Sequence, residues 1–80
     1  MPHCYLHFED DDGCCRDSEG FDAPDHAGAL VIIRRTAADI FHEEIDSGST
    51  AVAFYLCLDD TSGNRLMTLP IRAALGPSTG

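Results

Sequence analysis

The sequence predicts an α+β fold with the element order β-β-α-β-β. In this two-layer sandwich, an antiparallel four-stranded sheet carries one helix on one face. Residues 3–9 and 51–59 have the two-residue period of strands, and the apolar residues of 26–46 repeat with the period of a helix. Each of the two strands is followed by a glycine-containing turn and a second extended segment, which is typical of hairpins. We expect one domain over residues 1–74 and a flexible tail over 75–80.

Residues 3–21 are predicted to form the first hairpin. Its first strand alternates, and the side chains that share the core face are those of Cys4, Leu6 and Phe8. The opposite face of this strand carries His3, Tyr5, His7 and Glu9. Residues 9–13 are acidic, end in glycine and predict a turn, after which 14–16 resume a short extended segment. Gly20 is expected to allow a bulge or a left-handed residue in the irregular continuation.

The helix is predicted over residues 26–46, between an Asp25 N-cap and a left-handed Gly48. Its core face is expected to carry Ala29, Leu30, Ile33, Ala37, Ile40 and Phe41. Three further apolar residues widen this face beyond one stripe, namely Val31, Ile32 and Ala38. We therefore expect the helix to touch a second surface.

The second hairpin begins with residues 51–59, which are apolar on both faces and predict a central strand. Residues 60–64 have turn composition, and 65–71 form the return strand. Pro70 places this return strand at an edge or marks its end, because proline cannot donate to a ladder. The order in which the two hairpins join the sheet is left open by the sequence.

The composition limits the possible partners. The chain has 80 residues and a net charge of −9, which opposes binding to nucleic acid and to anionic membranes. No stretch reaches the length of about 18 apolar residues that a membrane helix needs, and the first residues lack the pattern of a signal peptide. We therefore expect a cytoplasmic protein with reduced thiols, in which Cys4 and Cys57 act as small apolar residues of the sheet.

Several short motifs resemble those of a family of short bacterial proteins that is described only as a domain of unknown function. The family commonly opens with Met-Pro-Arg-Tyr-Phe-Phe-His, continues with Arg-Asp-x-Glu-Gly and Leu-Pro-Asp before one helix, and closes with an Asp-x-x-Gly-x hairpin. The matching residues are His7, Arg16, Asp17, Glu19, Gly20, Pro24, Asp25, Asp60, Gly63, Arg65, Leu69, Pro70 and Ile71. The chain departs from the family at His3 and Cys4 and in the more apolar helix segment 30–33. The resemblance covers about residues 1–74 and implies a bacterial cytoplasmic protein, but no activity.

No metal or cofactor is expected, although four residues are weak candidates for metal ligands: His3, His7, Cys14 and Cys15. His3 and His7 share a strand face but lie about 13 Å apart along an extended chain, which is too far for one metal. The paired Cys-x-x-Cys spacings of zinc sites are absent. The acidic turn lacks the alternating spacing and distal Glu of an EF-hand loop, so a solvated turn is the simpler interpretation.

The sequence shows no Ser-His-Asp, Cys-His or paired-carboxylate arrangement, and we expect no enzymatic activity. The leading hypothesis is a small interaction or regulatory module, and we expect a homodimer because a core this small gains stability from a partner. Its contact residues would be Val31, Ile32 and Ala38 on the helix and Tyr5 and Tyr55 on the second sheet face. The alternative is a small-ligand or metal-binding protein that uses Tyr5, His7, Cys14 and the acidic turn. A third hypothesis, an acidic mimic of nucleic acid, rests on charge alone.

Overall fold

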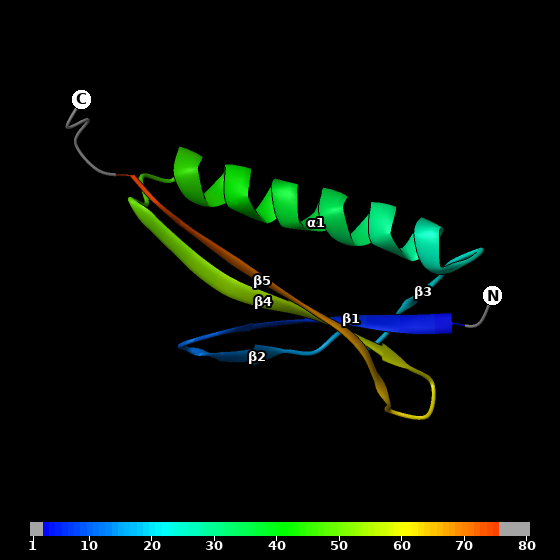
Figure 1. Ribbon diagram of the computed structural model, residues 1–80. Helices are drawn as coiled ribbons and strands as arrows, with labels where there is room; N and C mark the ends of the chain where they lie inside the picture. The colour runs from blue at the N-terminus through cyan, green and yellow to red at the C-terminus, as the bar shows by residue number, and fades with distance from the viewer. Residues whose placement is uncertain (1–2, 76–80) are drawn as a thin grey trace.

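The computed structural model describes residues 3–75 (Figure 1). Residues 76–80, which belong to the predicted flexible tail, lie outside the described residues. Residues 3–75 form one antiparallel sheet with a single long helix lying across one of its faces, so the predicted α+β two-layer fold is confirmed. The elements are β1 (His3–Asp10), β2 (Gly13–Cys15), β3 (Phe21–Asp22), α1 (His26–Asp46), β4 (Ala51–Asp60) and β5 (Arg65–Ala74). Within residues 3–75, no helix is both long and apolar enough to cross a membrane.

The strand order, which the sequence left open, is β2-β1-β4-β5, and β3 also pairs with β1. The two predicted hairpins are therefore joined through their long strands, β1 and β4, with Leu6 opposite Leu58 at the centre. The predicted hairpin of residues 3–21 contains one strand more than expected, because the return segment is divided into β2 and β3. β5 lies at the sheet edge, as Pro70 indicated, and continues three residues beyond the predicted 65–71.

The helix has the predicted bounds and the predicted caps. The Asp25 carboxylate accepts the Gly28 N–H at 2.7 Å, and Gly48 adopts a φ of 98° after the last turn. Fully buried helix residues follow one stripe, which consists of Ala29, Ile33 and Ala37. Leu30, expected on this stripe, is only half-buried and lies outside the core cluster, since it is rotated by about 100° from Ala29.

The core lies between the helix and the sheet. The fully buried sheet residues in this cluster are Cys4, Val52, Phe54, Leu56 and Leu58. These residues have the alternation that the sequence predicts, so the face of β1 and β4 toward the helix is confirmed. The other face of the same strands has no covering layer within residues 3–75, and Figure 1 shows the helix on one side alone.

Candidate functional site

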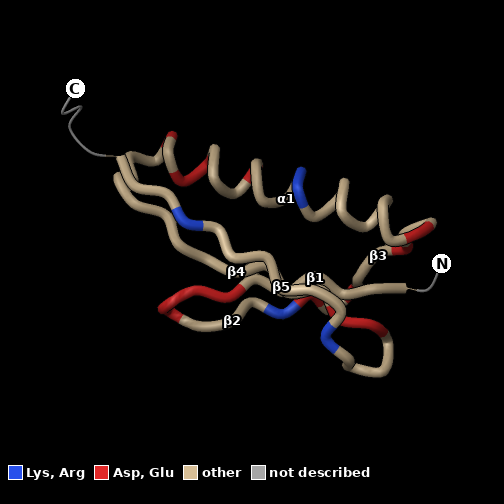
Figure 2. Tube along the Cα trace, viewed as in Figure 1, with Lys and Arg blue, Asp and Glu red and all other residues tan. Residues whose placement is uncertain are grey.

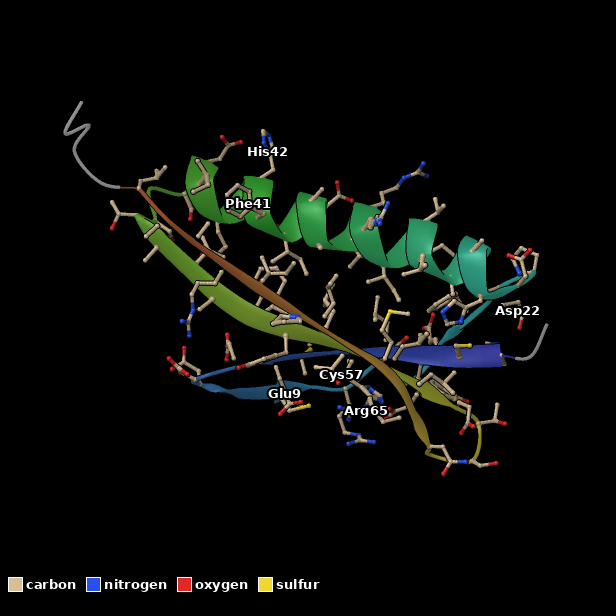
Figure 3. All side chains as sticks on the ribbon, in the orientation of Figure 1. Glu9, Asp22, Phe41, His42, Cys57 and Arg65 are labelled. Carbon is tan, nitrogen blue, oxygen red and sulfur yellow. The ribbon has the colours of Figure 1, made fainter. Side chains whose placement is uncertain are left out.

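The sheet face turned away from the helix, here called the open face, carries an unusual set of side chains. From β1 and β4 it presents Tyr5, His7, Glu9, Tyr55, Cys57 and Asp59. These residues are paired across the two strands, with Tyr5 opposite Asp59 and His7 opposite Cys57. Figure 3 shows Glu9, Cys57 and Arg65 below the sheet, on the side opposite the helix residues Phe41 and His42. The open face is therefore polar at its centre rather than apolar.

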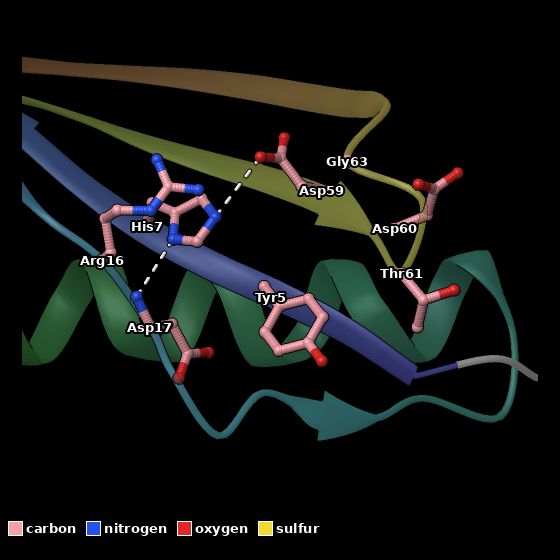
Figure 4. Close-up of a pocket in the computed structure, with 8 residues that line it drawn as sticks. All are labelled: Tyr5, His7, Arg16, Asp17, Asp59, Asp60, Thr61 and Gly63. Atoms are coloured by element: carbon pink, nitrogen blue, oxygen red, sulfur yellow. Dashed lines mark hydrogen bonds and ion pairs between the residues drawn. The ribbon is translucent and has the colours of Figure 1, made fainter.

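His7 is the centre of this polar group. The residue is only 5% exposed, and both ring nitrogens have partners. Its Nδ1 accepts the backbone N–H of Asp17 at 3.0 Å, and its Nε2 lies 3.3 Å from Oδ2 of Asp59 (Figure 4). Because Nδ1 accepts, the neutral ring carries its proton on Nε2, which faces the Asp59 carboxylate. His7 is thus bonded to the backbone of its own hairpin through Asp17.

A β-bulge brings Arg65 to the other oxygen of Asp59. The regular β4–β5 register ends at Leu58, and Asp59 then lies opposite Arg65 instead of Leu66. Nε of Arg65 donates to Oδ1 of Asp59. This bond raises the pKa of the Arg65 guanidinium. The buried Asp59 carboxylate is thus shared between one imidazole and one guanidinium.

Between β2 and β3, β1 has no neighbouring strand on this side among residues 3–75, and the Asp17 side chain takes the place of a strand partner there. Its Oδ2 accepts the Leu6 N–H of β1 at 3.1 Å, a bond that a neighbouring strand would otherwise make. Its Oδ1 accepts the N–H groups of Glu19 at 3.2 Å and Gly20 at 2.9 Å. Partial burial opposes ionisation of the carboxyl group, but these backbone donors outweigh it, and the pKa of Asp17 lies below its usual value. A charged side chain therefore holds the loop against β1.

Gly20 allows the same loop to approach β1 closely. Its φ is 72°, and a Cβ atom built there would lie 2.4 Å from the Cys4 carbonyl oxygen and 2.5 Å from Nε2 of His3. The expected left-handed residue at this position is confirmed, and the close approach is a second reason for glycine.

His3 is held by two acceptors at the start of β1. Its Nδ1 lies 2.7 Å from Oδ1 of Asp22, and its Nε2 lies 2.6 Å from the Glu19 carbonyl oxygen. Both contacts favour the imidazolium, the Asp22 bond more strongly, and they raise the pKa of His3. The rings of His3, Tyr5 and His7 form a column on β1, with centroids 5.2 Å and 6.5 Å apart.

Two hollows lie on the open face. The first has a volume of about 280 Å³ and is bounded by β1, the Asp17 loop and the β4–β5 turn (Figure 4). Its lining consists of Tyr5, His7, Arg16, Asp17, Asp59, Asp60, Thr61 and Gly63. The second has a volume of about 550 Å³ and includes Tyr55, Pro70 and Arg72 in its lining. Figure 2 shows the acidic turn between β1 and β2 in red and arginine positions on β5 in blue.

The two potentially reactive side chains at the centre of this face, those of His7 and Cys57, both have partners within the sheet. The His7 ring is engaged at both nitrogens and has no lone pair left to take a proton from a substrate. Cys57, its neighbour across the strands, is 1% exposed and donates its thiol proton to Oε2 of Glu9 at 3.3 Å. Burial, together with this bond, raises the pKa of the Cys57 thiol, whereas a nucleophilic cysteine needs a lowered one.

The weak metal candidates are not brought together. His3 bonds to Asp22 and Glu19, His7 belongs to the network just described, and Cys14 and Cys15 are exposed on β2. No group of three or more His, Cys, Asp or Glu residues between positions 3 and 75 is placed to hold one metal ion. Cys4 and Cys57 are buried in the sheet, as the sequence predicts.

The predicted contact residues lie on two opposite surfaces. Val31 is 56% exposed on the helix, where Ala38 is also exposed and Ile32 is half-buried. Tyr55 is 48% exposed on the open face, and Tyr5 is half-buried beside the first hollow. The structure therefore offers a helix flank and the open face as two separate surfaces.

The sequence did not predict that Asp59 and Arg65 lie with His7 at the centre of the site. It also did not predict that the Asp17 carboxylate accepts the Leu6 N–H. A signal for part of this site was present, because Arg16, Asp17, Glu19 and Gly20 are the residues that match the Arg-Asp-x-Glu-Gly motif. Their spacing now has a structural reason in the loop that Asp17 and Gly20 build.

Comparison with known families gives one match. The model of the family described as "Domain of unknown function (DUF6894)" matches residues 3–72, which confirms the resemblance to a family of short proteins without an assigned function. No curated protein and no solved structure matches the chain.

Proposed function

We propose that this chain, which belongs to the DUF6894 family, is a small non-enzymatic interaction module that binds another protein through its open face. The partner expected first is a second copy of the chain. We also propose a bacterial cytoplasmic setting, with neither nucleic acid nor a membrane as partner, because the net charge of −9 repels both phosphate backbones and anionic lipids.

The observation that carries this proposal is the location of the tyrosines and arginines. Both tyrosines of the chain lie on the open face, and so do three of its five basic residues, which are Arg16, Arg65 and Arg72. Tyrosine and arginine are among the residue types most enriched in the energetic centres of protein interfaces. Exposed acidic residues are most numerous in the β1–β2 turn and toward the end of the helix, while Glu9 lies on the open face and Asp10 and Asp11 line its second hollow.

The open face also has the shape and rigidity that binding requires. Its two hollows flank the centre, which the His7, Asp59 and Arg65 bonds hold in one arrangement. Contact residues held in place before binding lose less conformational entropy when a partner arrives. A domain of 80 residues has a small core, so a partner on this face would add to its stability.

The non-enzymatic part of the proposal rests on the chemistry of the site. The imidazole of His7 has no free nitrogen, and the Cys57 thiol is buried with a raised pKa. The alternative function, a small-ligand-binding protein, is supported by the hollow beside His7.

Native mass spectrometry of untagged protein at low micromolar concentration tests the proposal. We expect a metal-free dimer that Tyr55→Glu dissociates, because the substitution places a charge in the contact centre. Val31→Glu is the matched variant on the helix flank, the competing surface, and we expect it to leave the dimer intact. If Val31→Glu alone dissociates the dimer, the interface is the helix flank and not the open face. A monomer that carries one metal ion per chain, lost on adding a chelator, would overturn the proposal in favour of metal binding.

A further inference from the structure

The carboxylates in the hollow beside His7 already have partners. Asp17 accepts three backbone N–H groups, and Asp59 accepts from the His7 ring and from Arg65. Asp60 accepts N–H groups of its own turn, with bonds of 2.9 Å from both Ser62 and Asn64. The acceptors of this pocket are thus occupied by the fold itself.

The donors of the same pocket are not occupied. The guanidinium of Arg16 is exposed and makes no hydrogen bond or ion pair with any residue between 3 and 75. The hydroxyl groups of Tyr5 and Thr61, which also line the pocket, make no hydrogen bond within the same range. A ligand group that fits these donors has to be an acceptor, and one that matches a planar guanidinium is a carboxylate.

We propose that this pocket binds the side-chain carboxylate of a glutamate or aspartate in the partner protein, with Arg16 as the principal donor and the Tyr5 hydroxyl as the second. This inference rests on the proposed function, since it names the chemistry that the open face recognises. The volume of about 280 Å³ lies below the range of drug-sized ligand sites and suits one side chain. Because the pocket is open to solvent, it can receive that side chain from an extended segment of the partner.

The surrounding charge favours a carboxylate over a phosphate. Asp17, Asp59 and Asp60 line the pocket, and their charge is only partly balanced by Arg65 and Arg16. A singly charged carboxylate gains the Arg16 contact against moderate repulsion, whereas a phosphate dianion meets about twice that repulsion. The pocket thereby selects an acidic side chain over a phosphorylated one.

His7 acts as a positioning residue for this site. Its Nδ1 accepts the N–H of Asp17, the residue that directly follows Arg16, and its Nε2 is held by Asp59. The backbone that carries Arg16 is therefore attached to the sheet centre rather than free to move as a loop. Because the backbone is already fixed, binding a carboxylate costs only the rotamer freedom of the Arg16 side chain.

The test uses two small probes that differ by one group. N-acetyl-glutamate amide carries the proposed carboxylate, and N-acetyl-glutamine amide is its neutral isostere. In ¹⁵N-edited NMR titrations of the whole chain, we expect the glutamate probe to bind weakly and to shift the amides of Tyr5, His7, Asp17 and Gly63. We expect the glutamine probe to leave these amides unchanged. Equal shifts with both probes, or shifts confined to other regions, would overturn the proposal.

Three variants locate the site. Arg16→Gln should lower the affinity for the glutamate probe about ten-fold, because one charge-assisted contact is lost. Arg35→Gln is the matched control, because Arg35 is exposed on the helix and makes no hydrogen bond or ion pair with the described residues. Tyr5→Phe keeps the ring and should produce a smaller loss. An effect of Arg35→Gln as large as that of Arg16→Gln would mean non-specific charge attraction and would refute the site.

The outcome is separable from that of the proposed function. If Tyr55→Glu dissociates the complex but the glutamate probe does not bind, the open face is an interface and the carboxylate site is refuted. If the probe binds at Arg16 and Tyr55→Glu has no effect on assembly, the carboxylate site is supported and the dimer through the open face is refuted.

Discussion

The backbone N–H of Asp17 donates to Nδ1 of His7 at 3.0 Å, and this bond joins an irregular loop to the centre of the sheet. Its consequence is a fixed tautomer, because an accepting Nδ1 leaves the proton on Nε2, which faces the Asp59 carboxylate. A buried histidine is thus used as a connector between two segments that are distant in the sequence.

Replacing His7 with phenylalanine should destabilise the fold. The substitution keeps a planar ring but leaves the Asp17 N–H and one oxygen of buried Asp59 without a partner. We expect the free energy of unfolding to fall by about 1–3 kcal/mol, measured by urea denaturation. His42→Phe is the control, since His42 is exposed on the helix and the two residue types have similar helix propensity; its change should stay within about 0.5 kcal/mol. Equal effects of the two substitutions would show that the His7 bonds contribute nothing.

Gly20→Ala should be more harmful than Gly63→Ala, although both glycines have a positive φ. At Gly63, with a φ of 85°, nothing lies within 4 Å of an added Cβ, and only backbone strain of about 1–2 kcal/mol is expected. At Gly20 the added atom meets the Cys4 carbonyl oxygen, so about 1–3 kcal/mol of overpacking is added. Thermal unfolding monitored by circular dichroism measures the difference, and similar melting temperatures for the two variants would contradict the close approach.

The contribution of His3 to stability should depend on pH. The Asp22 carboxylate and the Glu19 carbonyl raise the pKa of His3 in the folded chain above the usual value of 6.5. The stabilisation is therefore fully present below pH 6.5 and is lost as the pH rises through the raised pKa. We expect His3→Gln to lower the urea midpoint clearly at pH 5.5 and much less at pH 9. A difference between the two proteins that stays constant over this range would refute the assignment.

The four cysteines should separate into two classes of reactivity. Cys14 and Cys15 are exposed on β2, whereas Cys4 and Cys57 are buried, and Cys57 has a raised pKa. A short iodoacetamide pulse on the folded protein should add two carbamidomethyl groups, and the same pulse in urea should add four. Peptide mapping identifies the modified residues. Fast labelling of Cys57 in the folded chain would contradict its burial and its bond to Glu9.

Most of the fold was predictable because its signals are local. The helix bounds follow from the Asp25 cap and from Gly48, each of which acts on its own neighbouring backbone. The core face of β1 and β4 follows from alternation, since Cys4, Phe54 and Leu58 are buried where the period of two residues places them. The additional strand β3 was not predicted, because two residues carry no periodicity.

The centre of the candidate site was not predictable in the same way. The pairing of Asp59 with Arg65 depends on a bulge after Leu58, and a shift of one residue changes which side chain lies opposite. The bond from Leu6 to Asp17 uses a side chain in place of a strand partner, and no regular pattern marks such a replacement.

The sequence by itself determined the helix, the two long strands with their core-facing residues and the turn that joins β4 to β5. Periodicity, caps and proline act within a few residues, so a single chain contains all that these features need. Only the tertiary structure decided the strand order, the bulge that sets Arg65 against Asp59 and the loop that sets Asp17 against His7. These features arise when segments from both hairpins meet, and their geometry depends on long-range register and on the burial of polar groups that must then find partners.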